Sequence, residues 1–287
     1  MPKATVNGLS MHYQQMGEGS DAVMIHGLFA SLAFWYLGVM PALATTRLRT
    51  TAYDLRGHGY SDTSASGYSC ADMATDLGAL LDHLEIDRAH LIAHSFGGAV
   101  ALQFALARPD RVLSLTLADV WVPSLQAEPL MWDSVRWRDA ALQAAHTGDR
   151  VEAMPRVARD GYDEWLRLQG DTAVGGLDAW IESALFSQWN SDSRVAQRWF
   201  HLVRETSAVD EMRSIAGLTP DRLNDIACPA LAMFGEHSGC LPTLEGLEAN
   251  LPACRTVMIP GAGHLHPLVR PDLFVHHAGE FIGNLES

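Results

Sequence analysis

A series of short apolar runs, separated by stretches with helical periodicity, most limits the folds open to this chain. The runs are rich in Val, Ile, Leu and Met and lack the polar–apolar alternation of a strand with one wet face: Ala22–His26, Arg49–Asp54, His90–His94, Val112–Asp119, Ala230–Phe234 and Arg255–Ile259. Strands buried on both faces of a parallel sheet have this composition. Their alternation with helices predicts an α/β fold with a doubly wound, mostly parallel sheet and right-handed crossovers.

Local signals between the runs support this arrangement. Alternating residues flank Asn7-Gly8, a pair that accommodates positive φ, and predict a β-hairpin at the start of the chain. Asp72–Glu85 carries Met and Leu at helical spacing. Phe96–Ala107 is rich in Ala and Leu and stops before Pro109, so we predict a second helix there.

The hydrophobic pattern changes between Trp121 and Thr219: strand-like runs disappear, and the spacing of apolar residues indicates amphipathic helices. All but one of the eight tryptophans fall in this segment. We therefore predict a core in two parts, residues 1–122 and 220–287, with residues 123–219 inserted as a helical lid. An aromatic underside of the lid would favour a hydrophobic small-molecule substrate.

Charge and composition exclude several classes of partner. Lysine and arginine total 20 against 34 acidic residues, a net charge of -14. This balance disfavours nucleic acid and anionic membrane surfaces, both of which attract basic faces. The N-terminus has no apolar signal segment and no run approaches the roughly 18 apolar residues of a membrane span, so we expect a cytoplasmic protein. A homodimer is left open.

The four cysteines show no paired or regular spacing, and we expect free thiols rather than disulfides or a zinc site. The histidines are scattered and no HExxH motif occurs. We therefore expect neither a metal nor another cofactor.

Ser95 lies where a buried strand passes directly into a helix, in LIAHSFGGAV (91–100). A sharp turn here lifts the hydroxyl above the sheet edge, and the helix N-terminus directs N–H groups at developing negative charge. Gly97 and Gly98 let the helix pack closely against the strand. The stretch resembles the G-x-S-x-G nucleophile elbow of the α/β-hydrolase superfamily, with Ala93 in place of the first glycine. The resemblance implies a serine nucleophile and a helical lid.

Two further stretches resemble loops of this family. VMIHGLFAS (23–31) is similar to the His-Gly loop that helps to form the oxyanion hole, which implies the backbone N–H groups of Leu28 and Phe96 as donors. His26 is expected to shape that loop. YDLRGHGYSD (53–62) resembles the D-x-R-G-x-G-x-S-D loop, whose Asp54 and Arg56 we interpret as structural. As candidate substrate contacts we name His26, together with His94 and Trp121 beside the expected catalytic residues.

The catalytic base is expected at His264. MIPGAGHLHPLVRP (258–271) resembles the family's late G-x-G-H-x-x-P loop, whose glycines turn the imidazole back over the sheet edge. A neutral imidazole can take the serine proton and return it to the leaving group. His266 lies close by, but the glycines and the spacing favour His264.

The triad acid departs from the common pattern. The usual aspartate position, in FGEHSGCLP, holds Ser238. We assign Asp119, at the end of the preceding strand in LSLTLADVWVP, where some members of the superfamily place their acid. Its carboxylate should accept from His264 Nδ1 at roughly 2.7–3.0 Å, with Ser238 playing no triad role. Glu236, Glu245 and an arrangement without an acid are the alternatives.

These residues predict a serine hydrolase that cleaves an ester, thioester or lactone through an acyl-enzyme. Two alternatives stay open. Cofactor-free lyases or dioxygenases of this fold use a His–Asp pair without a serine nucleophile, and Asp119-Val120-Trp121 resembles their acid position. A non-catalytic small-molecule binder would retain the pocket with a decayed triad.

Overall fold

The protein is represented by a computed structural model that describes residues 1–28, 30–126, 198, 201–202, 205–214 and 216–286. Most of the predicted lid lies outside these residues, with Trp132, Trp137, Trp165, Trp180, Trp189 and Trp199. The division into residues 1–122, 123–219 and 220–287 therefore stays a prediction.

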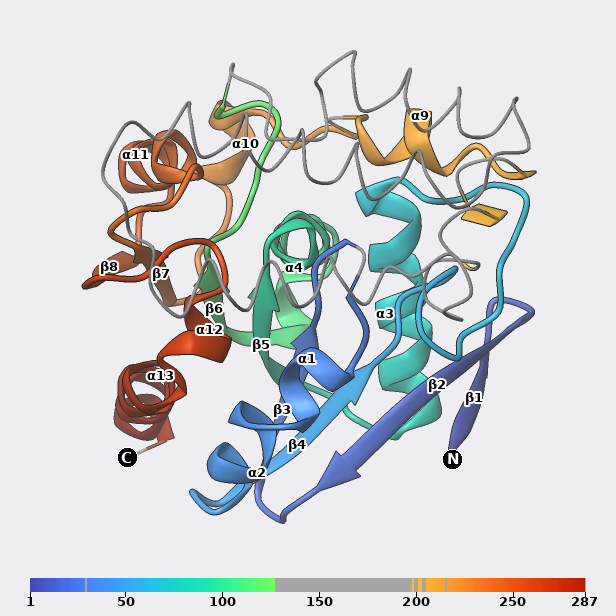
Figure 1. Ribbon diagram of the computed structural model, residues 1–287, viewed down its shortest axis with the longest axis horizontal. Coiled ribbons are helices and arrows are strands. Elements are labelled where there is room, and N and C mark those ends of the chain that lie inside the picture. Colours follow the sequence, from blue (N-terminus) through green and yellow to red (C-terminus); the bar gives the residue numbers. More distant parts are fainter. Residues whose placement is uncertain (29, 127–197, 199–200, 203–204, 215, 287) are drawn as a thin grey trace, which may run out of the picture.

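An eight-stranded sheet runs through the molecule in the order β1-β2-β4-β3-β5-β6-β7-β8 (Figure 1). Only the first two strands are antiparallel to their neighbours, and the neighbours from β4 to β8 are parallel. The strands are β1 Lys3–Val6, β2 Leu9–Met16, β3 Ser20–Ile25, β4 Leu48–Tyr53, β5 Ala89–His94, β6 Val112–Ala118, β7 Ala230–Gly235 and β8 Cys254–Ile259. The predicted doubly wound, mostly parallel sheet is confirmed.

Turn chemistry explains the hairpin that opens the sheet. Asn7 and Gly8 have φ values of 47° and 79°. Positive φ at both central residues is the requirement of a type I′ turn, whose twist matches that of the two flanking strands. The register that results pairs Val6 with Leu9 and Lys3 with His12.

The described helices are α1 Ala33–Tyr36, α2 Val39–Ala44, α3 Cys70–His83, α4 Phe96–Ala107, α9 Ala208–Met212, α10 Pro220–Leu223, α11 Leu241–Asn250, α12 His266–Val269 and α13 Pro271–Glu286, with a 3₁₀ turn at Pro109–Arg111. α3 begins earlier than predicted because Ser69 and Asp72 form a reciprocal capping box. α13 was not identified from the sequence.

Two hydrophobic cores lie on opposite faces of the sheet. One packs α3, α4 and α11 through residues such as Leu77, Phe104 and Leu247. The other packs α1, α2 and α13 through residues such as Trp35 and Phe274. Coverage of both faces explains why the parallel strands read as continuous apolar runs. No helix within the described ranges has the length and apolarity to span a membrane.

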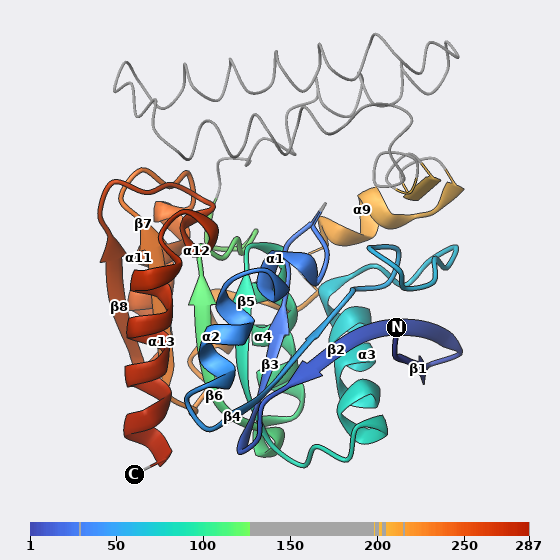
Figure 2. The ribbon, with the colours of Figure 1, turned by 60° about the horizontal axis from the view of Figure 1, so that its bottom comes forward.

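The strand order reverses between β3 and β5, which lie side by side although β4 comes between them in the chain. Their crossovers leave on opposite faces, so a crevice forms outside the carboxyl ends of the strands at this point. The connections that follow β3, β5, β6, β7 and β8 all emerge at this edge (Figure 2). Side chains from distant parts of the sequence can therefore meet here.

Close packing of α4 generates a stability prediction. A Cβ added at Gly98 would lie 2.0 Å from Cγ1 of Val120, whereas one at Gly283 on α13 meets nothing within 4 Å. Gly98→Ala should lower the free energy of unfolding by about 1–3 kcal/mol through overpacking. Gly283→Ala, the matched helical control, should raise it by about 0.5–1 kcal/mol because the unfolded chain loses freedom. Urea unfolding measures both, and equal effects would contradict the packing argument.

Candidate active site

Ser95 occupies the sharp turn between β5 and α4. Its φ of 52° and ψ of -126° are unusual for a residue with a side chain. Such a conformation costs on the order of 1–3 kcal/mol and persists only where the surroundings fix it. Here the Ser95 N–H donates to Ala118 O at 3.1 Å, and Ser95 O accepts from Gly98 N–H at 2.9 Å. The turn therefore holds the hydroxyl at the carboxyl edge of the sheet.

His264 reaches this hydroxyl from the loop that follows β8. Ser95 Oγ lies 3.1 Å from His264 Nε2, which is hydrogen-bond distance for a proton transfer between them. His94 Nε2–H donates to the His264 carbonyl oxygen at 2.9 Å and ties the loop to β5. The expected approach of serine and histidine is thus found.

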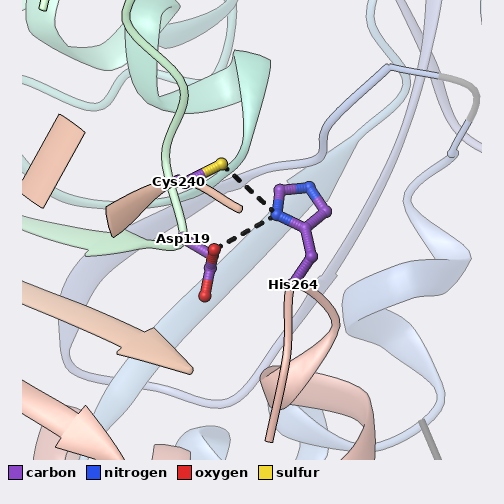
Figure 3. Close-up of side chains that lie close together, drawn as sticks. All are labelled: Asp119, Cys240 and His264. Carbon is purple, nitrogen blue, oxygen red and sulfur yellow. Dashed lines mark hydrogen bonds and ion pairs between the residues drawn. The ribbon is translucent and has the colours of Figure 1, made fainter. Parts of the chain in front are cut away.

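Asp119 lies on the other side of the imidazole. It directly follows β6 with a φ of 48°, and its carboxylate is wholly buried. His264 Nδ1 lies 3.2 Å from Asp119 Oδ1 (Figure 3). This is slightly longer than the expected bond, since the same oxygen also accepts the Ser238 hydroxyl. The structure thus brings Ser95, His264 and Asp119 into one hydrogen-bonded row.

The loop after β7 surrounds the Asp119 carboxylate. Gly235 N–H donates to Oδ2 at 2.8 Å, and the Ser238 hydroxyl donates to Oδ1. Ser238 is itself fixed, because its Oγ accepts from Cys240 N–H at 2.9 Å. Ser238 was expected to play no triad role, and its bond to the acid, which holds the carboxylate in place, was not predicted. The sequence held a signal for this contact. Neighbouring parallel strands end at the same edge, so position 238, where the family usually has its acid, lies close to Asp119.

The alternative acid Glu236 points elsewhere. Its Oε2 accepts from Gly261 N–H at 2.9 Å and lies 3.8 Å from His237 Nε2. Its side chain is 53% exposed. Glu236 therefore stabilises the turn before His264 and does not face the imidazole.

The backbone around the elbow leaves two donors for an oxyanion. A Cβ at Gly27 would lie 2.8 Å from Ser95 Cβ, and one at Gly97 would lie 2.6 Å from His26 O, so the two loops touch. Within the described part of the chain, neither the Leu28 nor the Phe96 N–H donates to an acceptor. These are the donors expected from the sequence, and their role remains a proposal.

His26 shapes the loop that carries Leu28. The wholly buried ring donates from Nδ1 to Gly27 O at 2.6 Å and accepts at Nε2 from Leu55 N–H at 3.1 Å. Burial lowers its pKa, so the ring is neutral. Asp54 supports the same loop by accepting from Leu32 N–H at 2.7 Å. Both ring nitrogens are occupied, which favours loop shaping over the predicted substrate contact.

His94 and Trp121 flank the elbow and are almost completely buried. The His94 ring stacks on Phe34 at 4.4 Å, and its Nδ1 has no partner among the described residues. Its bond to His264 assigns it to positioning rather than to the predicted substrate contact. The backbone N–H of Trp121 approaches Ser95 O at 3.4 Å. Its indole Nε1 lacks a partner within the described ranges. Trp121 remains the candidate substrate contact.

The thiol of Cys240 was not predicted to be part of the site. All four cysteines are free, as expected, but Cys240 Sγ lies 3.7 Å from His264 Nδ1. Figure 3 shows that thiol and carboxylate face the same ring nitrogen. Asp119, Cys240 and His264 form one of the described clusters that could hold a metal; His276, His277 and Glu280 on α13 form another. No spacing rule links Cys240 with His264.

The pKa values of the two histidines near Asp119 are shifted in opposite directions. Burial lowers the pKa of His264, but the Cys240 sulfur and the Asp119 carboxylate beside Nδ1 outweigh it, and the net pKa lies well above the usual value. Burial lowers the pKa of His266 to about 4, although Asp119 Oδ2 is 3.8 Å away. His266 is therefore a neutral donor to Met233 O at 3.0 Å.

Comparison with known proteins agrees with this fold. A family profile described as alpha/beta hydrolase fold matches residues 23–154. The solved structure of Est816, titled as an N-acyl homoserine lactone degrading enzyme, superposes with a TM-score of 0.73 at 24% identity and covers 98% of this chain and 100% of its own. The chain thus has the α/β-hydrolase fold.

Two curated relatives extend the comparison. The dihydrolipoyllysine-residue acetyltransferase component of the acetoin cleaving system of Pseudomonas putida is 41% identical over 268 residues, 92% of this chain and 64% of its own. The pimeloyl-[acyl-carrier protein] methyl ester esterase of Aeromonas hydrophila is 26% identical over 96% of this chain and 100% of its own. The chain covers between 42% and 64% of the length of three of the curated relatives that it matches. The chain therefore shares a fold with these proteins, and an esterase is among its relatives.

The electrostatics of the site generate a prediction that needs no substrate. The His264 imidazole should titrate above the ordinary histidine pKa of about 6.5. Asp119→Asn should lower that pKa, because an amide does not stabilise the imidazolium by charge. NMR of the ring nitrogens measures both values, and His266 is an internal control that stays neutral above its pKa of about 4. A His264 pKa unmoved by the substitution would contradict the pairing.

Proposed function

We propose that this chain is a serine hydrolase that cleaves an ester, thioester or lactone of a hydrophobic small molecule through an acyl-enzyme. The observation that carries the proposal is the row of atoms from Ser95 Oγ, 3.1 Å from His264 Nε2, to His264 Nδ1, 3.2 Å from Asp119 Oδ1. The strained turn at Ser95 and the buried carboxylate both have a use in this reaction.

The proposed chemistry follows from the position of each group. Ser95 Oγ attacks the carbonyl carbon while its proton passes to His264 Nε2. The Leu28 and Phe96 N–H groups stabilise the negative oxygen, and Asp119 stabilises the imidazolium. His264 then gives the proton to the leaving group. In the second half of the reaction water attacks the acyl-enzyme and gives a proton to His264, which returns it to Ser95 Oγ as the acid product leaves.

The substrate class is supported by the described surroundings of the elbow. The Trp121 backbone N–H approaches Ser95 O, and His94, the residue before Ser95, stacks on Phe34. Aromatic walls favour an apolar acyl or ring-containing group. The esterase and lactone names of the relatives agree with this class.

Ser95→Ala should reduce hydrolysis by about 10⁴-fold or more and abolish labelling by a fluorophosphonate, because no nucleophile remains. The assay is a panel of p-nitrophenyl esters and thioesters of increasing acyl length. Ser66→Ala, at an exposed loop serine, is the matched control and should keep both activity and labelling. Turnover that survives in Ser95→Ala would instead favour a His–Asp lyase or dioxygenase, and ligand binding without turnover would favour a binder.

Asp119→Asn should reduce kcat by about 10²–10⁴-fold, since the amide neither stabilises the imidazolium nor selects its tautomer. Ser238→Ala should reduce kcat by about tenfold, the loss of one hydrogen bond to a charged group. Steady-state kinetics on the same ester, with thermal unfolding to verify the fold, separates the two roles. Near-native kcat in Asp119→Asn would remove Asp119 from the triad.

A further inference from the structure

Three different donor atoms converge on one point behind the triad histidine. Asp119 Oδ1, Cys240 Sγ and His264 Nδ1 all lie within 4.8 Å of one another. Figure 3 shows the sulfur and the carboxylate approaching the same edge of the imidazole from two loops. The proposed hydrolysis uses the carboxylate and the imidazole but has no task for the thiol.

Two of the three separations match edges of a tetrahedral metal site, and the third, between Oδ1 and Sγ, is within 4.8 Å. Zinc bonds of about 2.0–2.1 Å to nitrogen, 2.0–2.2 Å to oxygen and 2.3 Å to sulfur imply edges of about 3.3 Å (N···O) and 3.6 Å (N···S). The observed separations are 3.2 Å between Nδ1 and Oδ1 and 3.7 Å between Nδ1 and Sγ. A cation can therefore take the centre with small side-chain adjustments.

The donor set also selects the type of metal. Thiolate and imidazole are preferred by zinc and similar thiophilic cations, whereas magnesium and calcium require oxygen ligands. Outer partners that orient the ligands are already in place: Gly235 N–H and the Ser238 hydroxyl hold the Asp119 carboxylate, and Cys240 N–H donates to Ser238.

We propose that Asp119, Cys240 and His264 form an inhibitory binding site for Zn²⁺ or another thiophilic divalent cation. On binding, the Cys240 thiol and His264 Nδ1–H each release a proton to solvent, and the cation takes their place. The inhibition rests on the proposed function. An imidazole that carries a cation on Nδ1 is a poor base, because Asp119 no longer stabilises the protonated ring and Nε2 resists a proton.

Binding is tested directly with Co²⁺, which reports a bound thiolate by a charge-transfer band in the near ultraviolet. The native chain and Ser95→Ala should both show this band at one ion per chain. Cys240→Ser should lose it, whereas Cys228→Ser, at a half-buried thiol outside the cluster, should keep it. Thermal unfolding of the metal-free proteins verifies that each variant folds. A band that persists in Cys240→Ser would overturn the site.

Inhibition is tested with buffered Zn²⁺ on an ester substrate, each variant compared with its own metal-free rate. The native chain should lose activity and regain it with EDTA. Cys240→Ser should need at least about 100-fold more Zn²⁺, because even outer-shell partners change metal affinity by 10–100-fold. Inhibition retained in Cys240→Ser but lost in His276→Ala would assign it to the surface cluster on α13 and overturn the proposal. If no ester is turned over, the Co²⁺ band still decides the site and only the proposed function fails.

Discussion

The buried carboxylate of Asp119 is the constraint on which the rest of the site depends. An unpaired carboxylate in an apolar interior costs several kcal/mol, so its position persists only with donors around it. Those donors come from the loops after β7 and β8: Gly235 N–H, the Ser238 hydroxyl and His264 Nδ1–H. One charge therefore fixes three loops relative to one another at the carboxyl edge of the sheet.

The other buried histidines around the site are neutral and have structural roles. His26, His94 and His266 are buried, and burial lowers the pKa of each. A neutral imidazole supplies one donor and one acceptor, which suits it to bridge backbone groups of neighbouring loops. His264 differs because its Nδ1 hydrogen-bonds to the Asp119 carboxylate, whereas His266 Nε2 bonds to Met233 O and lies 3.8 Å from the same carboxylate. The hydrogen-bond partner rather than the residue type separates the candidate base from the structural rings.

Much of the fold follows from the sequence because buried parallel strands and an abrupt strand–helix junction are local patterns. The six predicted runs correspond to β3 to β8, and Phe96–Ala107 is α4. The meeting of Ser95, Asp119 and His264 was predictable because parallel strands end at one edge. The contact of Cys240 with His264 was not, since it depends on how a loop folds around a carboxylate in three dimensions. α13 was missed although its amphipathic stripe was present in the sequence.

The neighbouring ends of β6 and β7 have a consequence for the position of the acid. Residues 119 and 238 are in hydrogen-bond contact, and Asp119 borders the imidazole Nδ1 of His264. A chain with aspartate at both positions would hold two carboxyl groups that share one proton, as closely spaced acids do. One negative charge would still stabilise the histidine. A single substitution at position 238 would therefore place a second carboxyl group against Asp119, so the two strand ends offer adjacent positions for one acid.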